Sequence, residues 1–373
     1  MKKIALILAD ATLTGAPIHA LQIIKAIRGK DYRFLVICPN GPFTKKLEEE
    51  KVDFKTVLMR GPFDRKSSAQ IRDIVTDFKP DIIHCHGTRG TWLGLIATRN
   101  LKDIKKVYTE HLWTDNYHLP SLAYEQLQKR GLKFLSRYAD KIIAVSKAVR
   151  NFLISEGFER KKIALIPNGV GREYLEISPI KKPDTAPMIL GCVGSLNDQK
   201  NYRMIIKAFY LLKLERPDLN IYLQIIGEGP LKKNLEEMVA KHRNINELVS
   251  FPGRVEDLKE RYQHFTIFIN CSISESFGLA LAEAMAVGLP VVASEIPALS
   301  ELVDDAGIMV EAKNKEQIKD AILRYIDDEK LRSEMGQKAK DRIRKKFSEE
   351  VMVKKTKELY LSVIPANEPE SKK

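Results

Sequence analysis

The chain has 373 residues, of which 44% are hydrophobic and 30% are charged, and this composition predicts a soluble globular protein with two domains. No run of about 18 apolar residues occurs, and Asp10 interrupts the apolar run of residues 4–9, so neither a membrane-spanning helix nor a signal peptide is expected. The net charge of +13 arises from basic residues scattered over many segments, so nucleic acid is not an expected partner.

The first half of the chain alternates short β-branched runs with longer amphipathic stretches. Strands are predicted near residues 3–9, 33–38, 81–85, 106–110, 141–145 and 163–166. The first of them leads into a loop that contains Gly15 and ends at Pro17, a residue well tolerated in the first turn of a helix. Such alternation is typical of a parallel sheet with helices on both faces.

The second half repeats this pattern after a proline-rich break. Its strands are predicted at residues 188–193, 221–226, 248–251, 267–270 and 290–293, and helices dominate after Lys315. The break, residues 178–187, holds three prolines and no periodic apolar pattern, so we expect the interdomain linker there. The last predicted helix covers residues 348–363, and the polar tail, residues 365–373, is expected to be disordered.

The predicted fold class is therefore α/β, with two Rossmann-like, doubly wound domains. We expect an N-terminal domain of residues 1–180, joined by the C-terminal helix at about residues 348–363, and a C-terminal domain of residues 187–347, and the two domains are expected to face a central cleft. In such sheets ligands bind beyond the carboxyl ends of the strands, where the strand order reverses. Functional residues are therefore expected in the loops that follow strands.

Cysteine and histidine positions bear on metal binding. The four cysteines are far apart in apolar runs and form no Cys-x-x-Cys pair, so all are expected to be buried free thiols: Cys38, Cys85, Cys192 and Cys271. His84 and His86 share one face of a strand end, but no third ligand is near, and no Asp-x-Asp triplet occurs. We therefore expect no bound metal.

One charged residue stands out in the apolar segment of residues 276–293, namely Glu283. Ser276 is expected to cap a helix that begins at about residue 277 or 278, and Gly288 and Pro290 are expected to end it. An ionised carboxylate in a helix that is apolar on nearly every side costs several kcal/mol unless it is hydrogen-bonded. Its partner would be either the vicinal hydroxyls of a ribose or a cation of the protein core.

Two loops at strand ends add groups that suit an anionic ligand. Glu275 precedes the helix of Glu283, and the free backbone N–H groups at about residues 277–279 suit a diphosphate or sugar hydroxyls. Gly194 ends the first strand of the second half, and Lys200 follows it, near enough to neutralise a phosphate at the same edge.

These motifs resemble the glycosyltransferases of family four, which are retaining enzymes of the GT-B fold. The resemblance covers nearly the whole chain, and its most specific part is the Glu-x7-Glu signature of Glu275 and Glu283. Its other parts are the glycine loop at residues 14–16, the histidine that ends Tyr108-Thr-Glu-His111, the segment Ile166-Pro-Asn-Gly-Val170, and the Gly-x-Leu-x-x-x-Lys pattern of residues 194–200.

The resemblance implies roles for individual residues. Glu283 would bind the ribose, Lys200 the diphosphate and Glu275 the donor sugar, and His111, Lys200 and Glu275 are the catalytic candidates. Further donor contacts would come from Gly15, Ala16, Gly194, Ser195, Gly253, Arg254, Ser276, Phe277, Gly278 and Leu279.

Ser195 departs from the family pattern. Family members usually carry an arginine at this position, directly after the glycine, so a bidentate phosphate clamp is missing. The loss could weaken donor binding or change the choice of donor. Arg254 or Arg203 could substitute for the missing arginine from a neighbouring position.

The implied activity is the retaining transfer of a hexose-type sugar from a nucleotide diphosphate sugar to a glycan or lipid-linked acceptor. Such an enzyme would act in cell-surface polysaccharide or glycolipid synthesis, and no metal or other cofactor is expected. A sugar-nucleotide epimerase of the same fold and a non-catalytic nucleotide-sugar-binding module remain alternatives.

The basic excess lies entirely in the first half of the chain. Residues 1–183 contain 33 Lys and Arg against 19 Asp and Glu, whereas residues 184–373 contain 29 against 30. An anionic membrane or glycan would suit this excess, and so would a merely well-solvated surface. Residues 122–138 mix basic and apolar side chains and could touch a bilayer or simply cover the domain. We expect a cytoplasmic protein, with peripheral contact at the inner face of the cell membrane as the further possibility.

Overall fold

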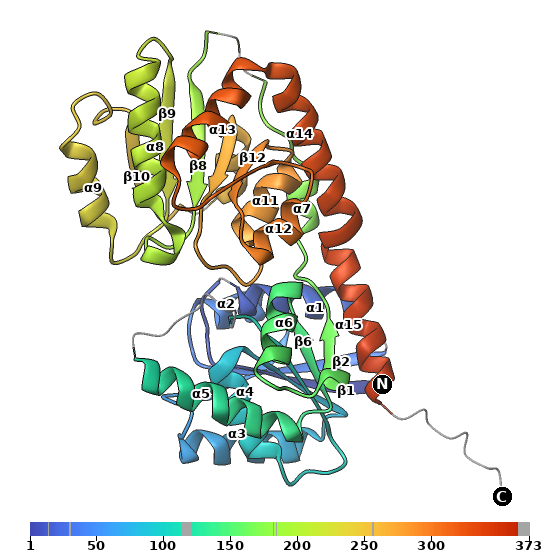
Figure 1. Cartoon of the computed structure of the whole chain (residues 1–373). Coiled ribbons are helices and arrows are strands. Elements are labelled where there is room, and N and C mark those ends of the chain that lie inside the picture. The colour runs from blue at the N-terminus through green and yellow to red at the C-terminus, as the bar shows by residue number, and fades with distance from the viewer. Residues whose placement is uncertain are drawn as a thin grey trace, which may run out of the picture. The chain divides into compact units, whose positions relative to one another are not determined.

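The computed structural model describes residues 1–13, 15–29, 31–112, 121–181, 183, 185–255 and 257–364, with the backbone alone at residues 122 and 123. The chain forms two compact units, each with its own parallel sheet (Figure 1). The N-terminal unit contains residues 1–169 and the C-terminal segment that begins at Glu349, and the C-terminal unit contains Val170–Ser348. Among the described helices, none has the length and apolar character needed to cross a bilayer.

The N-terminal unit is built on a seven-stranded parallel sheet in the order β3-β2-β1-β4-β5-β6-β7. Its strand order reverses between β1 and β4, which are paired in register from Ile4 with Ile82 to Leu8 with His86. The strands are β1 (Lys2–Leu8), β2 (Tyr32–Cys38), β3 (Asp53–Thr56), β4 (Ile82–His86), β5 (Lys105–Glu110), β6 (Lys141–Ala144) and β7 (Ile163–Leu165). The six strands predicted in this half are confirmed, and β3 is an addition.

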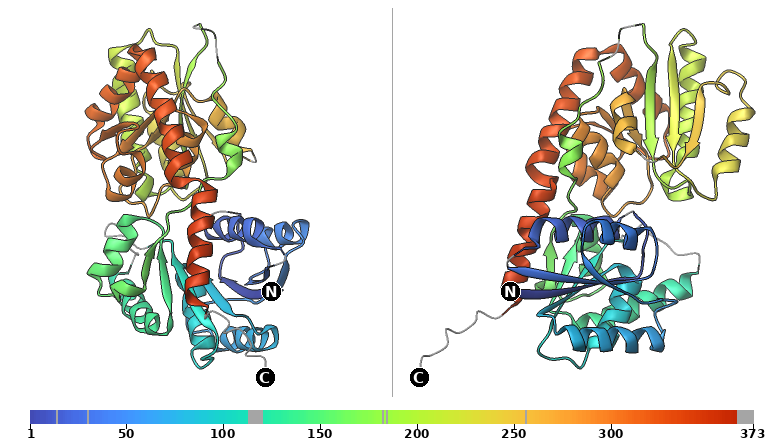
Figure 2. Two further views of the ribbon diagram at one scale, coloured as in Figure 1. Left: turned by 90° about the vertical axis from the view of Figure 1, so that its right-hand side faces the viewer. Right: turned by 180° about the vertical axis from the view of Figure 1, so that it is seen from behind.

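Helices cover both faces of this sheet, as Figures 1 and 2 show. The helices are α1 (Ala16–Ile27), α2 (Pro42–Glu49), α3 (Arg65–Phe78), α4 (Gly87–Thr98), α5 (Leu122–Leu135), α6 (Lys147–Ser155) and α15 (Glu349–Val363), with short 3-10 turns at Ser136–Tyr138 and Arg160–Lys162. One core joins the buried side chains of β1, such as Leu6, to Ile23 of α1, Phe43 of α2 and Tyr360 of α15. Helix α4 packs on the other face, where Gly94 lies so close to Cys85 that a Cβ would be 2.4 Å from its Sγ.

The C-terminal unit is built on a six-stranded parallel sheet in the order β10-β9-β8-β11-β12-β13, which reverses between β8 and β11. The strands are β8 (Met188–Val193), β9 (Ile221–Ile226), β10 (Val249–Gly253), β11 (Ile267–Asn270), β12 (Val291–Ser294) and β13 (Ile308–Val310). The helices are α7 (Arg172–Leu175), α8 (Tyr202–Glu215), α9 (Lys232–Ala240), α10 (Leu258–His264), α11 (Leu279–Val287), α12 (Pro297–Val303), α13 (Lys315–Asp327) and α14 (Glu329–Arg342). A 3-10 turn covers Asp198–Lys200, and a π-helical turn covers Ile343–Phe347. The predicted α/β class with two Rossmann-like domains is therefore confirmed.

The proline-rich break is not the boundary between the units. The chain changes unit at residues 169 and 170 and again at 348 and 349, and Val170 forms a parallel bridge with Ser348. The expected linker is instead fastened to the C-terminal unit, because the Ile180 N–H donates to the Gln263 carbonyl at 2.9 Å and Lys340 donates to the Ile177 carbonyl at 2.5 Å. Prolines interrupt the periodic apolar pattern by which a helix or strand is recognised in a sequence, so this segment was predicted to be a linker. Backbone groups near the prolines nevertheless form hydrogen bonds with the C-terminal unit.

Two smaller predictions concern the cysteines and the tail. All four cysteines are free and buried, as expected. Residues 365–373 lie outside the described residues.

Candidate functional site

The carboxyl edge of the C-terminal sheet brings Lys200 and Glu275 together at its switch point. Lys200 follows β8 and Glu275 follows β11, and these two strands are neighbours. The Lys200 Nζ lies 2.5 Å from the Glu275 Oε1. The two side chains keep 21% and 11% of their surface exposed, so the pair lies at the surface of its unit rather than in the core.

Neighbours on the same strand end hold the Glu275 carboxylate in place. Ser272 Oγ donates to Glu275 Oε1 at 3.0 Å, and Asn270 Nδ2 lies 3.5 Å from the same oxygen. The backbone N–H of Ser272 in turn donates to the Asn270 Oδ1 at 3.1 Å. All of these contacts end on Oε1, so among the described residues Oε2 has no protein donor and can accept from a ligand hydroxyl. No sequence signal pointed to Asn270 or Ser272, because their role depends on the fold of the loop.

Gly194 and a second glycine bring two strand-end loops into backbone contact. The Gly194 N–H donates to the Ile226 carbonyl at 3.0 Å, and a Cβ on Gly227 would lie 2.0 Å from the Gly194 oxygen. Gly227 has a φ of 147° and donates its N–H to the Gly253 carbonyl at 3.0 Å. A side chain at Gly227 would push the loop of Gly194 outward, so Gly227 is a site-shaping residue that the sequence reasoning missed.

Helix α11 begins at Leu279, one or two residues later than predicted, and without a side-chain cap. Gly278 is its N-cap, with a φ of 94°, and Ser276 makes no capping hydrogen bond. Glycine suits this position because a φ of 94° strains other residues, and a Cβ at Gly278 would also lie 2.6 Å from Leu299 Cδ2. The Ala282 N–H donates to the Gly278 carbonyl, so the N–H groups of residues 279–281 have no partner within the helix.

The predicted end of α11 at Gly288 is confirmed, and Gly288 adopts the left-handed conformation. Phe277 is buried against Phe347.

Glu283 is bonded to a tyrosine and not to a cation. The Tyr262 hydroxyl donates to Glu283 Oε2 at 2.8 Å, and no lysine or arginine of the described residues bonds this carboxylate. Burial raises the pKa of Glu283 to about 7, the Tyr262 hydrogen bond acts in the opposite direction, and the negative charge of Glu173 adds to the rise. Of the two partners considered for Glu283, the core cation is therefore not found.

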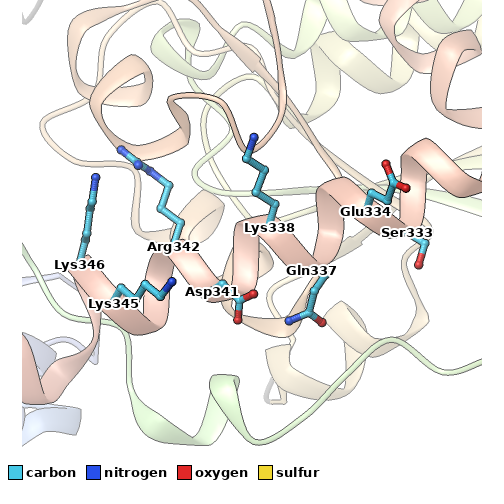
Figure 3. A pocket seen from close by; sticks show the side chains of 8 residues that line it. All are labelled: Ser333, Glu334, Gln337, Lys338, Asp341, Arg342, Lys345 and Lys346. Carbon is cyan, nitrogen blue, oxygen red and sulfur yellow. The ribbon is translucent and has the colours of Figure 1, made fainter.

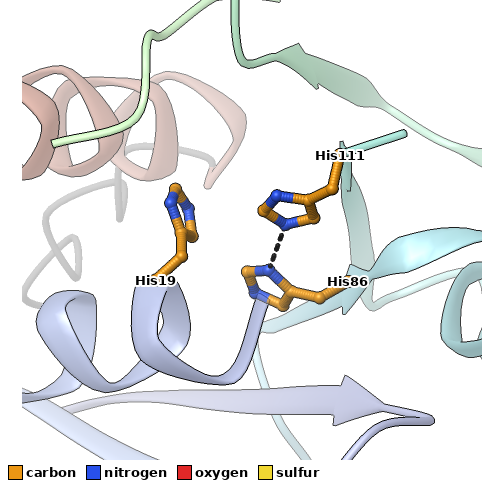
Figure 4. Close-up of side chains that lie close together, drawn as sticks. All are labelled: His19, His86 and His111. Carbon is orange, nitrogen blue, oxygen red and sulfur yellow. Dashed lines mark hydrogen bonds between the residues drawn. The ribbon is translucent and has the colours of Figure 1, made fainter. Parts of the chain in front are cut away.

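His111 lies in the N-terminal unit within a cluster of three histidines (Figure 4). It follows β5 directly, His86 is the last residue of β4, and His19 stands in the first turns of α1. The His86 Nδ1 and His111 Nε2 atoms are 3.3 Å apart, and the His19 ring centroid lies 5.5 Å from that of His86 and 5.1 Å from that of His111. The prediction that His86 has no third histidine nearby is wrong, because α1 brings in a residue far away in the sequence. The His84 ring centroid lies 4.1 Å from that of His86, but both nitrogens of His84 are bonded, to Tyr360 and Thr109.

The three clustered histidines are neutral and incompletely hydrogen-bonded. Burial lowers the pKa of His19 to about 4, opposed by the neighbouring Asn168 side chain, and holds the pKa values of His86 and His111 well below the usual range. Both ring nitrogens of His19 and the Nε2 of His86 are buried without a hydrogen-bond partner of ordinary geometry among the described residues. A buried polar group without a partner costs about 1–3 kcal/mol, so the cluster is disposed to bind a ligand.

Gly15 opens the helix that carries His19. It is the N-cap of α1, has a φ of 49°, and its carbonyl accepts from the His19 N–H at 3.0 Å. A Cβ at Gly15 would meet no atom within 4 Å, so the space beside this loop is open among the described residues. Ala16 begins the helix, and Thr14 lies outside the described residues.

Two family models match the chain, one after the other. The model for "Glycosyltransferase Family 4" matches residues 13–174, and the model for "Glycosyl transferases group 1" matches residues 174–342. The chain belongs to the group 1 glycosyltransferases.

Relatives and solved structures agree with this membership. The chain is 25% identical to the UDP-Gal:alpha-D-GlcNAc-diphosphoundecaprenol alpha-1,3-galactosyltransferase of Escherichia coli, over 97% of each chain. It is 23% identical to the N-acetyl-alpha-D-glucosaminyl L-malate synthase of Bacillus anthracis, over 93% of this chain and 90% of that one. Its fold is similar to that of HepE from Anabaena, solved in complex with UDP, with a TM-score of 0.80 at 20% identity over 97% of this chain and all of that one.

In this glycosyltransferase the candidate substitutes for the missing arginine do not reach the ion pair. Ser195 is exposed, and so are Arg254, which follows β10, and Arg203, which stands in the first turn of α8. Within the described part of the chain, neither arginine forms a hydrogen bond or ion pair with Lys200 or Glu275. Lys200 is therefore the cation bonded to Glu275 at this edge.

A shallow pocket on α14 of the glycosyltransferase is separate from these residues (Figure 3). Two of its basic side chains are occupied, because Lys338 pairs with Asp305 at 2.7 Å and Arg342 pairs with Asp304 at 2.8 Å. None of the predicted site residues lines it. The pocket is lined by Ser333, Glu334, Gln337, Lys338, Asp341, Arg342, Lys345 and Lys346.

Proposed function

We propose that this glycosyltransferase moves a hexose-type sugar from a nucleotide diphosphate sugar to a glycan or lipid-linked acceptor, with retention of the anomeric configuration. The observation that carries the proposal is the pair of Lys200 and Glu275 at the switch point of the C-terminal sheet, with one carboxylate oxygen of Glu275 free of protein donors. Ligands of doubly wound sheets bind at this edge.

Each part of the donor has a matching group in the C-terminal unit. Lys200 and the free N–H groups of residues 279–281 would meet the diphosphate, since a helix N-terminus favours negative charge. Glu275 Oε2 would accept from a sugar hydroxyl. Glu283, which lacks a cation partner among the described residues, would accept from both ribose hydroxyls. Gly253 and Arg254 are proposed to line the nucleobase.

The proposed chemistry uses no nucleophile of the enzyme and no metal at the diphosphate. Breaking the bond between the anomeric carbon and the phosphate places negative charge on the leaving group and positive charge on the sugar ring. Lys200 and the α11 amides are placed before the reaction begins and would stabilise the leaving charge. The acceptor would attack from the face that the diphosphate leaves, and the departing phosphate would take its proton. His111, Gly15 and Ala16 are proposed to contact the donor, as the family resemblance implies.

A lipid-linked or polysaccharide acceptor is supported by the names of the relatives and by the surface of α5. The E. coli relative is named for a diphosphoundecaprenol acceptor. Helix α5 exposes the apolar side chains Leu127 and Phe134 beside Lys133, and the Arg137 guanidinium lies 4.0 Å from the Phe134 ring centroid. Such a mixture suits an anionic membrane surface, so we propose peripheral contact at the inner face of the cell membrane.

Product analysis tests the proposed reaction. With a nucleotide sugar and an acceptor, the protein is expected to release the nucleotide diphosphate and form a glycoside, and the proton coupling of the new anomeric centre is expected to match that of the donor. An isomerised nucleotide sugar formed from donor alone would instead identify an epimerase. Binding without release in the presence of acceptor would identify a non-catalytic module.

A further inference from the structure

We propose that a basic pocket in the N-terminal unit binds a phosphate group, at a site separate from the donor residues. The pocket has a volume of about 390 Å³, and it is lined by the second half of α5, the 3-10 turn that follows it and the segment between α6 and β7. Its lining contains one carboxylate, Glu159, and four cations, Arg130, Lys133, Arg137 and Lys162. The proposal does not depend on the proposed transfer reaction.

The sheet topology places this pocket at the edge opposite the histidine cluster. Arg137 comes shortly before β6, and Lys162 comes directly before β7. Because the strands are parallel, residues that precede them share the amino edge of the sheet, whereas His111 follows β5 at the carboxyl edge. Ligands of doubly wound sheets bind at the carboxyl edge. The basic pocket is therefore a second site and not part of the donor site.

Three of the four cations have no carboxylate partner among the described residues. Arg130, Lys133 and Arg137 recur at intervals of three and four residues along α5 and the turn after it, so they lie on one side of this segment. All three are exposed. Lys129 is the contrast on the same helix, because its ammonium pairs with Glu125 at 2.8 Å. Cations that gather on one side without a carboxylate attract an anionic ligand.

A glycine leaves space around the Lys133 ammonium. A Cβ on Gly157 would lie 2.6 Å from the Lys133 Nζ. Gly157 also has a φ of 77°, a conformation that other residues rarely adopt. The ammonium therefore lies over bare backbone, and no side chain of residue 157 stands between it and an incoming anion.

The remaining groups fix the geometry and the charge of the pocket. The Arg137 guanidinium lies over the Phe134 ring, 4.0 Å from its centroid, and this contact leaves the N–H groups at its edge free for an oxyanion. Lys162 donates to the Arg137 carbonyl at 3.0 Å and so joins the two walls. The Glu159 carboxylate is held by Lys161 at 2.7 Å. Guanidinium and ammonium groups are common partners of phosphate, so the pocket matches a phosphate group.

Titration of the isotope-labelled chain with glycerol phosphate, at constant ionic strength, tests the site at individual residues. The amide resonances of Gly157 and Phe158 are expected to shift until the site is saturated. Lys133→Gln and Arg137→Gln are each expected to weaken this binding at least tenfold. Lys45→Gln, which removes an exposed lysine of α2 in the same unit, is the matched control and is expected to bind as the unaltered chain does. Thermal melting shows whether each variant is folded.

Sedimentation with vesicles distinguishes the two sources of such a phosphate group. If a lipid headgroup is the source, the chain is expected to bind vesicles of phosphatidylglycerol more tightly than vesicles of phosphatidylcholine, and Lys133→Gln and Arg137→Gln are expected to remove the difference. If these substitutions weaken the binding of glycerol phosphate alone, the ligand is a soluble phosphate ester.

Unshifted resonances at Gly157 and Phe158, or shifts that Lys133→Gln and Arg137→Gln leave unchanged, would overturn the proposal. Neither result would bear on the transfer reaction, because these measurements use no donor and no acceptor.

Discussion

Replacing Glu283 by glutamine should change both the stability of the protein and its affinity for nucleotide, in opposite directions. Burial raises the pKa of Glu283 to about 7 from 4.5. The folded state therefore binds this proton more tightly than the unfolded state does. The stability that the protonated group contributes is complete below about pH 4.5 and is lost as the pH rises through about 7. Above that pH the loss amounts to about 3 kcal/mol.

Glutamine cannot ionise, and its amide oxygen can still accept from the Tyr262 hydroxyl. The Glu283→Gln variant is therefore expected to match the unaltered protein at about pH 5 and to exceed it in stability by up to about 3 kcal/mol at about pH 8. Denaturation by urea at several pH values measures this difference. Glu236→Gln, an exposed carboxylate of the same unit, is the control and should show no pH-dependent difference.

Nucleotide binding should move the other way. Loss of a charge-assisted hydrogen bond of about 1.5–3 kcal/mol corresponds to a roughly 10–100-fold weaker affinity. The unaltered protein should also bind nucleotide less tightly below about pH 7, because the ribose hydroxyls need the ionised carboxylate, and Glu283→Gln should lose this dependence. A stability difference that stays constant between about pH 5 and about pH 8, with unchanged nucleotide affinity, would refute the reasoning.

Three further substitutions test the surroundings of the site. Tyr262→Phe removes the hydrogen bond that lowers the pKa of Glu283, so the pH below which nucleotide affinity falls should move upward in calorimetric titrations; an unmoved midpoint would contradict this. Gly227→Ala places a Cβ 2.0 Å from the Gly194 oxygen at a φ of 147°, and should lower the thermal unfolding midpoint and weaken nucleotide binding, whereas a midpoint like that of the unaltered chain would show that the two loops can separate. Ser195→Arg restores the arginine of the family pattern and should tighten nucleotide binding roughly tenfold, and an unchanged affinity would show that the loop cannot aim the new side chain at a phosphate.

The sheet skeleton was predictable because buried strands are continuous apolar runs. β1, β4 and β11 are buried nearly throughout, and runs of this kind are visible without neighbours. β3 was missed because Asp53–Thr56 is exposed along most of its length and has no apolar pattern. The predicted boundary between the units was wrong for a related reason. The prolines of residues 178–187 are visible in the sequence, but the hydrogen bonds that attach this segment to the C-terminal unit are not.

The site was predictable where a residue carries its own signal or follows a predicted strand, as Lys200 and Glu275 do. Glu283 is conspicuous because it is a single charge in an apolar segment, and the fold places it where burial shifts its pKa. Tyr262, Ser272 and His19 carry no such signal. Their roles depend on contacts with side chains of other helices and loops. Such contacts form only in the folded chain and cannot be read from the sequence.

The turnover of Lys200→Ala tests the central claim most directly. The variant should melt as the unaltered protein does, because Lys200 is partly exposed and Glu275 keeps the Ser272 hydrogen bond. Lys207→Ala, an exposed lysine on α8, is the matched control. We expect nucleotide release in the presence of acceptor to fall about a hundredfold in Lys200→Ala and to stay unchanged in the control. A folded Lys200→Ala protein that transfers sugar at the unaltered rate would contradict the account.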